Sequence, residues 1–143
     1  MKMIVGTLLL ALAIGAAGAT RAVDGPIPHA QLKSADCIDT SQINDWRIVD
    51  ERTAIVRTGP KHYLVTLQSA CPQLSHPPGL IFNSRSNAGA GQGRICGGIG
   101  ETVHTRGRPA CAIQSVSIID KTRFNQLGVD AKRYNGGNRS PAH

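Results

Sequence analysis

The sequence has few aromatic and few acidic side chains. The first shortage limits how large a hydrophobic core the protein can form, and the second leaves the chain with a net positive charge. It has one tryptophan, two tyrosines and two phenylalanines in 143 residues. Aromatic side chains bury the most apolar surface, so a chain with so few of them buries little apolar surface per residue. Covalent cross-links are therefore expected to add to its stability.

Lys and Arg outnumber Asp and Glu by 16 to 9, for a net charge of +7. Such a charge favours an anionic partner, or serves only solubility.

Long apolar runs are missing except near the N-terminus. Lys2 precedes an unbroken apolar run from Leu8 to Ile14, and small residues follow it. This layout is typical of a secretory signal peptide, so residues 1–19 are predicted to be one, with cleavage after Ala22 as the alternative. The stretch is too short and too rich in glycine for a spanning helix. The mature form is therefore predicted to be periplasmic or secreted, with no transmembrane anchor.

Closely spaced cysteines, as in C-x2-C, are also missing, so no metal site and no cofactor are expected. The chain has four cysteines, Cys37, Cys71, Cys96 and Cys111. An even number in an exported chain predicts two disulfides. If the last two cysteines lie on strands paired around a turn at Gly107, they are too far apart to bond. Of the two pairings left, Cys71–Cys96 with Cys37–Cys111 is favoured because its outer bridge ties the first ordered segment to the last.

Apolar and β-branched residues alternate with polar ones in short segments, which predicts a mostly β fold. A turn-forming spacer at 59–62 makes a hairpin of the second and third segments, and a change of phase between Ile113 and Val116 indicates a bulge or a bend. The predicted strands are 46–50, 53–58, 63–68, 80–82, 94–105 and 110–120. Five to six such strands predict a small barrel or sandwich stapled by two disulfides.

The expected domain organisation is a single β domain between flexible ends. Residues 20–35 contain glycine and two prolines and read as an extended leader. Residues 36–128 form the disulfide-stapled β domain, with one short helical turn after position 121. Residues 129–143 are expected to be a flexible tail.

The sequence lacks two common motifs of enzymes: the G-x-S-x-G elbow of serine hydrolases and the glycine-rich phosphate-binding loop of nucleotide-binding proteins. His62 and His104 could act as acid and base, with Lys61 stabilising phosphate, in a small basic secreted nuclease. Two basic clusters, 106–108 and 121–133, could form a nucleic-acid-binding patch, although few aromatics lie among them.

Several segments together resemble a family of small exported bacterial four-cysteine proteins of unknown function. The resemblance covers about residues 36–120 and is carried by Cys37-Ile38, Ile43, Trp46–Asp50, Tyr63–Leu67, Cys71, Arg94–Cys96 and Cys111–Ile113. It implies no catalytic residue. It does imply an acid shortly after the third cysteine, where the family tends to have an aspartate, and Glu101 is the nearest acid here.

The sequence contains no motif that specifies an activity, so the function predicted from it is unknown, and a non-enzymatic role is the leading hypothesis. We expect a non-enzymatic periplasmic or secreted protein that binds an unknown protein or an anionic envelope component, or supports the envelope. The alternatives are an inhibitor of an envelope or secreted hydrolase, acting through a loop at 75–79 or 88–93, and the small basic nuclease.

Overall fold

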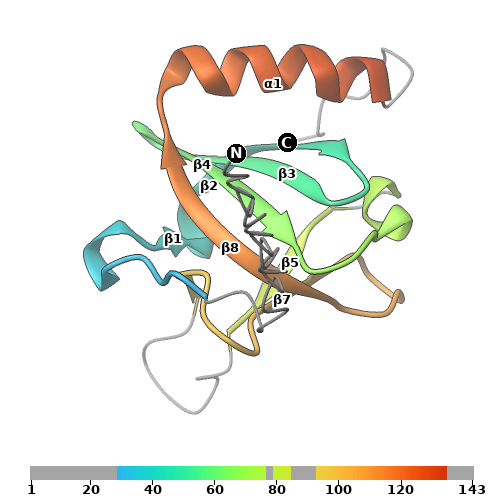
Figure 1. Cartoon of the computed structure of the whole chain (residues 1–143), viewed down its shortest axis with the longest axis horizontal. Helices are drawn as coiled ribbons and strands as arrows, with labels where there is room; N and C mark the ends of the chain where they lie inside the picture. The colour runs from blue at the N-terminus through green and yellow to red at the C-terminus, as the bar shows by residue number, and fades with distance from the viewer. Residues whose placement is uncertain (1–28, 77–78, 85–92, 135–143) are drawn as a thin grey trace, which may run out of the picture.

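The alternating segments fold into a strongly curled antiparallel sheet with one helix across its outer side (Figure 1). The computed structural model describes residues 29–76, 79–84 and 93–134. The predicted signal peptide, most of the predicted leader and the tail beyond position 134 lie outside the described residues.

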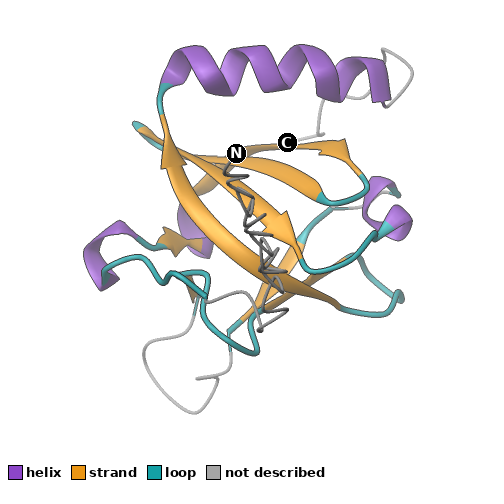
Figure 2. Ribbon diagram, in the orientation of Figure 1, coloured by secondary structure: helices purple, strands orange, loops and turns teal. Residues whose placement is uncertain are grey.

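The main sheet has six strands in the order β2-β3-β4-β8-β7-β5, and every neighbouring pair is antiparallel. Its strands are β2 (Ile43–Asp50), β3 (Thr53–Thr58), β4 (Lys61–Leu67), β5 (Ile81–Asn83), β7 (Thr102–His104) and β8 (Cys111–Ile119). The sheet curls into a half-barrel (Figure 2). The prediction of a mostly β, barrel-like fold with two disulfides is confirmed.

A second, two-stranded sheet packs against the half-barrel through its buried isoleucines. It pairs β1 (Ile38–Asp39) with β6 (Arg94–Ile95). Three short 3-10 helices complete the connections: η1 (Ser34–Asp36), η2 (Thr40–Gln42) and η3 (Pro72–Ser75).

Side chains of the central strands divide between two cores, as period-two alternation requires. On β4, Tyr63, Val65 and Leu67 are buried in the concave core, whereas Leu64 packs on the other face. That outer face is covered by helix α1 (Lys121–Tyr134). The predicted hairpin of β3 and β4 is confirmed, with a turn at Gly59-Pro60.

The predicted irregularity in the last strand is a bulge. Thr66 pairs with Ser115 but Leu67 pairs with Ile113, so β8 has one extra residue there. In a regular strand Ile113 and Val116 would face opposite sides of the sheet. The extra residue turns them to the same side, and both are buried in the concave core.

The predicted single strand 94–105 is wrong. The structure has β6 and β7 there, in different sheets, joined by a turn. Gly97 and Gly100 have φ of +88° and +87°, a conformation that strands do not contain.

The favoured disulfide pairing is also wrong, because Cys37 bonds Cys96 and Cys71 bonds Cys111. The register of the strands explains both bonds. Cys37 and Cys96 directly flank the paired strands β1 and β6, and their Cα atoms are 4.5 Å apart. Leu67, the last residue of β4, pairs with Ile113 near the start of β8. Cys71 follows β4 by four residues and Cys111 begins β8, so the same pairing brings these two cysteines together.

The predicted helical turn is one end of a helix of 14 residues, which also includes residues 129–134 of the predicted tail. Asp120 caps the helix, accepting a hydrogen bond from the amide of Arg123 at 2.7 Å. Phe124, Leu127 and Ala131 recur on one face and are buried against the outer side of the sheet. The spacing of these three apolar residues is typical of an amphipathic helix. Gly128 lies between them, and the low helix propensity of glycine weakens that pattern.

Candidate functional site

Among the strands that the structure describes, β2 and β5 are the two edges of the half-barrel, and residues from both line a groove. Its volume is about 380 Å³, within the usual range of ligand pockets, about 300–1,000 Å³. Its walls come from three parts of the chain: η2, β2 and the segment that enters and forms β5. The lining residues are Thr40, Ile43, Trp46, Leu80, Ile81 and Phe82.

A bulge in β2 builds the first wall. Ile43 and Trp46 are three positions apart, and in a regular strand they would point to opposite faces. Ile43 pairs with Thr58 and Asp45 pairs with Arg57, so β2 has one extra residue between Ile43 and Asp45. This bulge turns Ile43 and Trp46 to the same side, and both line the groove.

The second wall is the segment Leu80–Phe82. Leu80 and Phe82 pack against the concave core, whereas Ile81 is 40% exposed at the groove mouth. The chain just before β5 passes close to the indole: a side chain added at Gly79 would place its Cβ 3.9 Å from Cζ2 of Trp46. Leu80 and Phe82 therefore fix this wall to the core, and Ile81 is left facing solvent.

The third wall is η2, which positions Thr40. Asp39 caps this short helix by accepting hydrogen bonds from the amide and the hydroxyl of Ser41, at 3.0 and 2.6 Å. The amide of Thr40 donates to the main-chain oxygen of Gly93 at 2.6 Å. The Cys37–Cys96 disulfide lies just before this segment and fixes β1 on β6.

The cap on η2 makes the pKa of Asp39 a local probe of this wall. Hydrogen bonds from the side chain and then the amide of Ser41 lower the pKa of Asp39. We expect Ser41→Ala to raise this pKa toward its ordinary value when the protein and the variant are compared by NMR titration. Because the folded-state pKa is lowered, the ionised cap stabilises the fold above the unfolded pKa, and this contribution is lost as the pH falls through the folded one.

The chemistry of the groove is that of a binding surface. The described residues that line it carry no charge, and their side chains offer a hydroxyl and an indole N–H as polar groups. More of the exposed groove surface is polar than apolar. Trp46 and Phe82 supply aromatic faces for stacking and apolar contact. Among the described residues of the lining, no side chain is an acid, a base or an activated nucleophile.

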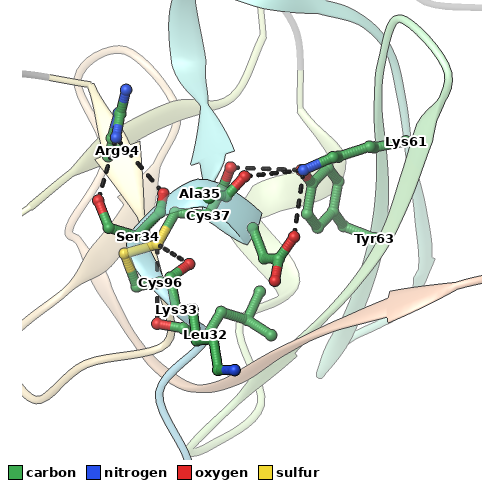
Figure 3. A network of polar contacts seen from close by, with 10 residues as sticks. Leu32, Lys33, Ser34, Ala35, Cys37, Lys61, Tyr63, Arg94 and Cys96 are labelled. Carbon is green, nitrogen blue, oxygen red and sulfur yellow. Dashed lines mark hydrogen bonds and ion pairs between the residues drawn. A yellow bond between two sulfur atoms is a disulfide. The ribbon is translucent and has the colours of Figure 1, made fainter.

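Lys61, predicted to stabilise phosphate, is engaged by acceptors of its own chain. Its ammonium donates to the main-chain oxygen of Ala35 at 2.8 Å and forms an ion pair with Asp36 at 3.3 Å. The hydroxyl of Tyr63 donates to the main-chain oxygen of Cys37 at 3.3 Å. Figure 3 shows how these contacts gather around the segment that carries Cys37. Lys61 thus anchors η1 on β4.

The structure does not bring His62 and His104 together. His62 pairs with Ile119 at one end of β8, and its ring packs on the first turn of α1. His104 follows Val103, which pairs with Cys111 at the other end of β8. The two histidines are therefore about 25 Å apart along the strand direction, too far to act on one phosphate. The acid–base pair of the nuclease hypothesis is not assembled.

Glu101, the acid suggested by the family resemblance, is buried and binds its own loop. Its carboxylate accepts hydrogen bonds from the amides of Cys96, Gly97 and Gly98, the shortest at 2.7 Å. Successive amides that converge in this way form an anion-binding nest, and here the anion is a side chain of the same chain. The amide of Ile113 donates to the main-chain oxygen of Glu101 at 3.0 Å, which ties the turn to β8.

The basic clusters are separated by the length of β8. Arg106 and Arg108 are exposed in the turn before β8, whereas Lys121 and Arg123 begin the helix that follows it. Lys132 and Arg133, the other members of the second cluster, lie in the last turn of that helix.

Two further searches of the described residues bear on ligands and membranes. No group of three or more His, Cys, Asp or Glu is placed to hold a metal ion within 29–76, 79–84 and 93–134. Over the same residues no helix has the length and apolar character needed to span a bilayer. Of the loops predicted for an inhibitor, 75–79 and 88–93, residues 77–78 and 88–92 fall outside the described part of the chain.

Sequence analysis missed the groove because its residues are apolar and read as ordinary strand interior. The one available signal was the spacing of Ile43 and Trp46, which breaks the alternation of β2 in the same way that Ile113 and Val116 break that of β8.

One known family matches this chain. The model described as "Family of unknown function (DUF6491)" covers residues 1–135. No curated protein matches the chain, and no solved structure matches it. The comparisons therefore transfer neither an activity nor a ligand, and the function has to be argued from the groove.

Proposed function

The chain belongs to this family of unknown function (DUF6491), and from that premise we propose that it is a binding protein, with the groove between β2 and β5 as its binding site. The observation that carries the proposal is the place of the groove. It lies beside β2 and β5, the two edge strands of the sheet in the described part of the chain, and it contains the only tryptophan of the chain. A half-buried tryptophan and a half-buried phenylalanine that line one concave site offer the aromatic contact surface that ligand pockets use.

Two features support binding rather than catalysis. The described residues that line the groove include no titratable side chain, and two of the residues considered for catalysis are engaged elsewhere: Lys61 anchors η1, and Glu101 fills the amide nest. A concave site with aromatic and aliphatic side chains and uncharged polar groups can select a partner by shape and contact.

The proposed location is outside the reducing cytosol. All four cysteines are paired in two disulfides, which persist in oxidising compartments. Together with the signal peptide predicted at residues 1–19, this supports export to the periplasm or the exterior, where the protein would bind a partner or contribute to the envelope.

Dye binding tests the site. N-phenyl-1-naphthylamine is neutral, so the basic charge of the protein does not attract it, and it fluoresces when bound in an apolar site. We expect saturable binding with loss of Trp46 emission through energy transfer. Bound dye would cover the side chain at position 81, and a charge covered by an apolar ring loses hydration without gaining a partner, so Ile81→Asp should weaken binding by about tenfold or more.

The matched control is Ile118→Asp. Ile118 is 45% exposed, close to the 40% of Ile81, but it lies on β8 and does not line the groove. Its substitution should leave dye binding unchanged. Equal losses in both variants, or no loss in Ile81→Asp, would show that the dye binds elsewhere and would refute the proposed site.

A further inference from the structure

We propose that the helix-covered face of the sheet carries a second binding site, which takes a phosphate group beside β3, β4 and the first turn of α1. The site is separate from the groove, because side chains on this face point away from the concave core. Its central residue is Arg57 on β3. The Nε atom of Arg57 is buried and has no hydrogen-bond partner, and the ion pairs of the described residues do not include Arg57.

The strand register places Arg57 in a row of polar side chains. Its partners on the neighbouring strands are Asp45 on β2 and His62 on β4. Paired residues of neighbouring strands point to the same face of a sheet, so the three side chains lie side by side on the face that α1 crosses (Figure 1). The ring of His62 packs on that of Phe124, with the centroids 4.8 Å apart, which places the row beside the first turn of the helix.

The acidic side chains near this row are engaged by other groups. Asp45 forms an ion pair with Arg47 at 3.1 Å rather than with Arg57. Asp120 caps α1 through the amide of Arg123, at 2.7 Å. Arg57 is therefore left without a counter-ion among the described residues. A half-buried guanidinium without a counter-ion has lost hydration and gained no partner in return, so an anion that binds it replaces the lost interactions.

The donors of this site match a phosphate group. The guanidinium of Arg57 presents its N–H groups in a planar fork that fits phosphate oxygens, and the ring of His62 carries an N–H in either tautomer. Lys121 adds a third donor within reach, because it is exposed and lies three positions before Phe124, on the same side of the helix. A phosphate monoester has three free acceptor oxygens for these three donors, whereas a carboxylate has only two.

An NMR titration of the oxidised full chain with inorganic phosphate, at constant ionic strength in sodium chloride, tests the site. Arginine Nε–H groups give signals of their own, and the Arg57 signal is assigned by its absence from Arg57→Lys. We expect this signal and those of His62 to shift saturably. Arg57→Gln should weaken binding about tenfold or more, because it removes charge-assisted hydrogen bonds. The matched control, Arg108→Gln, removes the same charge from an exposed turn at the other end of β8 and should leave binding unchanged.

Vesicles distinguish two sources of the phosphate group. Co-sedimentation with phosphatidylglycerol vesicles that depends on Arg57 and is reversed by inorganic phosphate would assign the site to a lipid head group. Saturable binding of inorganic phosphate without co-sedimentation would assign it to a soluble phosphate compound.

Three results would overturn the inference. They are shifts spread evenly over exposed arginines such as Arg108, phosphate binding by Arg57→Gln equal to that of the unaltered protein, and acetate binding as tight as phosphate binding. If Arg57→Gln does not fold, the location of the shifts in the unaltered protein decides. The groove lies on the concave side of the sheet, so each of these results leaves the proposed function standing.

Discussion

Replacing Glu101 with alanine is expected to lower the free energy of unfolding by about 3–5 kcal/mol, one of the two largest effects we predict. The carboxylate of Glu101 is the acceptor for three main-chain amides, those of Cys96, Gly97 and Gly98. Each buried amide left without an acceptor costs about 1–3 kcal/mol, and water entering the site recovers part of that cost. Chemical denaturation followed by Trp46 fluorescence measures the change.

Two further variants separate the amide nest from a general effect of charge. Glu101→Gln keeps the shape of the side chain but places an NH₂ donor against the amide donors, so it should also destabilise the fold. Glu51→Ala removes an exposed carboxylate and should change stability by less than about 0.5 kcal/mol. If Glu101→Ala were as stable as Glu51→Ala, the nest would have no structural role.

The geometry around Gly97 makes the same turn intolerant of a side chain. Gly97 has a φ of +88°, and a Cβ there would lie 2.8 Å from the main-chain nitrogen of Val116 on β8. The turn therefore sits directly against the bulged part of β8. Glu101 acts by holding this close approach, which explains why an acid is useful at this distance from the third cysteine.

Removing the Cys37–Cys96 disulfide by double serine substitution is expected to lower the free energy of unfolding by about 4 kcal/mol and also to weaken binding in the groove. The cysteines are separated by 59 residues, and a closed loop of that length restricts the unfolded chain by about 4 kcal/mol. The bond also holds β1 on β6, immediately before the groove residue Thr40. Denaturation and dye titration of one sample measure both effects.

The other disulfide is the matched control. Cys71 and Cys111 are separated by 40 residues, so their replacement should cost nearly as much stability. Their segments stay attached through the β4–β8 pairing, and neither cysteine lines the groove. Dye binding should therefore persist in folded protein of this variant. Equal loss of binding in both double variants would contradict the separate role of the Cys37–Cys96 bond, and alkylation of the native protein should find no free thiol.

Local sequence was sufficient where neighbouring residues make the decisive contacts. The β3–β4 hairpin follows from alternation on both sides of Gly59-Pro60, and the bulge in β8 follows from the apolar phase change between Ile113 and Val116. In both cases the information lies within a few residues, because period and turn chemistry are local properties. The helix was also encoded locally, in the spacing of its buried residues, but Gly128 concealed it.

What only the tertiary structure decided depends on which distant segments meet. The sequence by itself determined that four cysteines are available to form two bonds, but the partners follow from the pairings of β1 with β6 and of β4 with β8. It likewise determined the apolar character of Trp46 and Phe82. That these two residues face one groove follows from the curl of a six-stranded sheet that brings its first and last strands to the same opening. Strand order and curl arise from contacts between residues far apart in the chain, and no local pattern contains them.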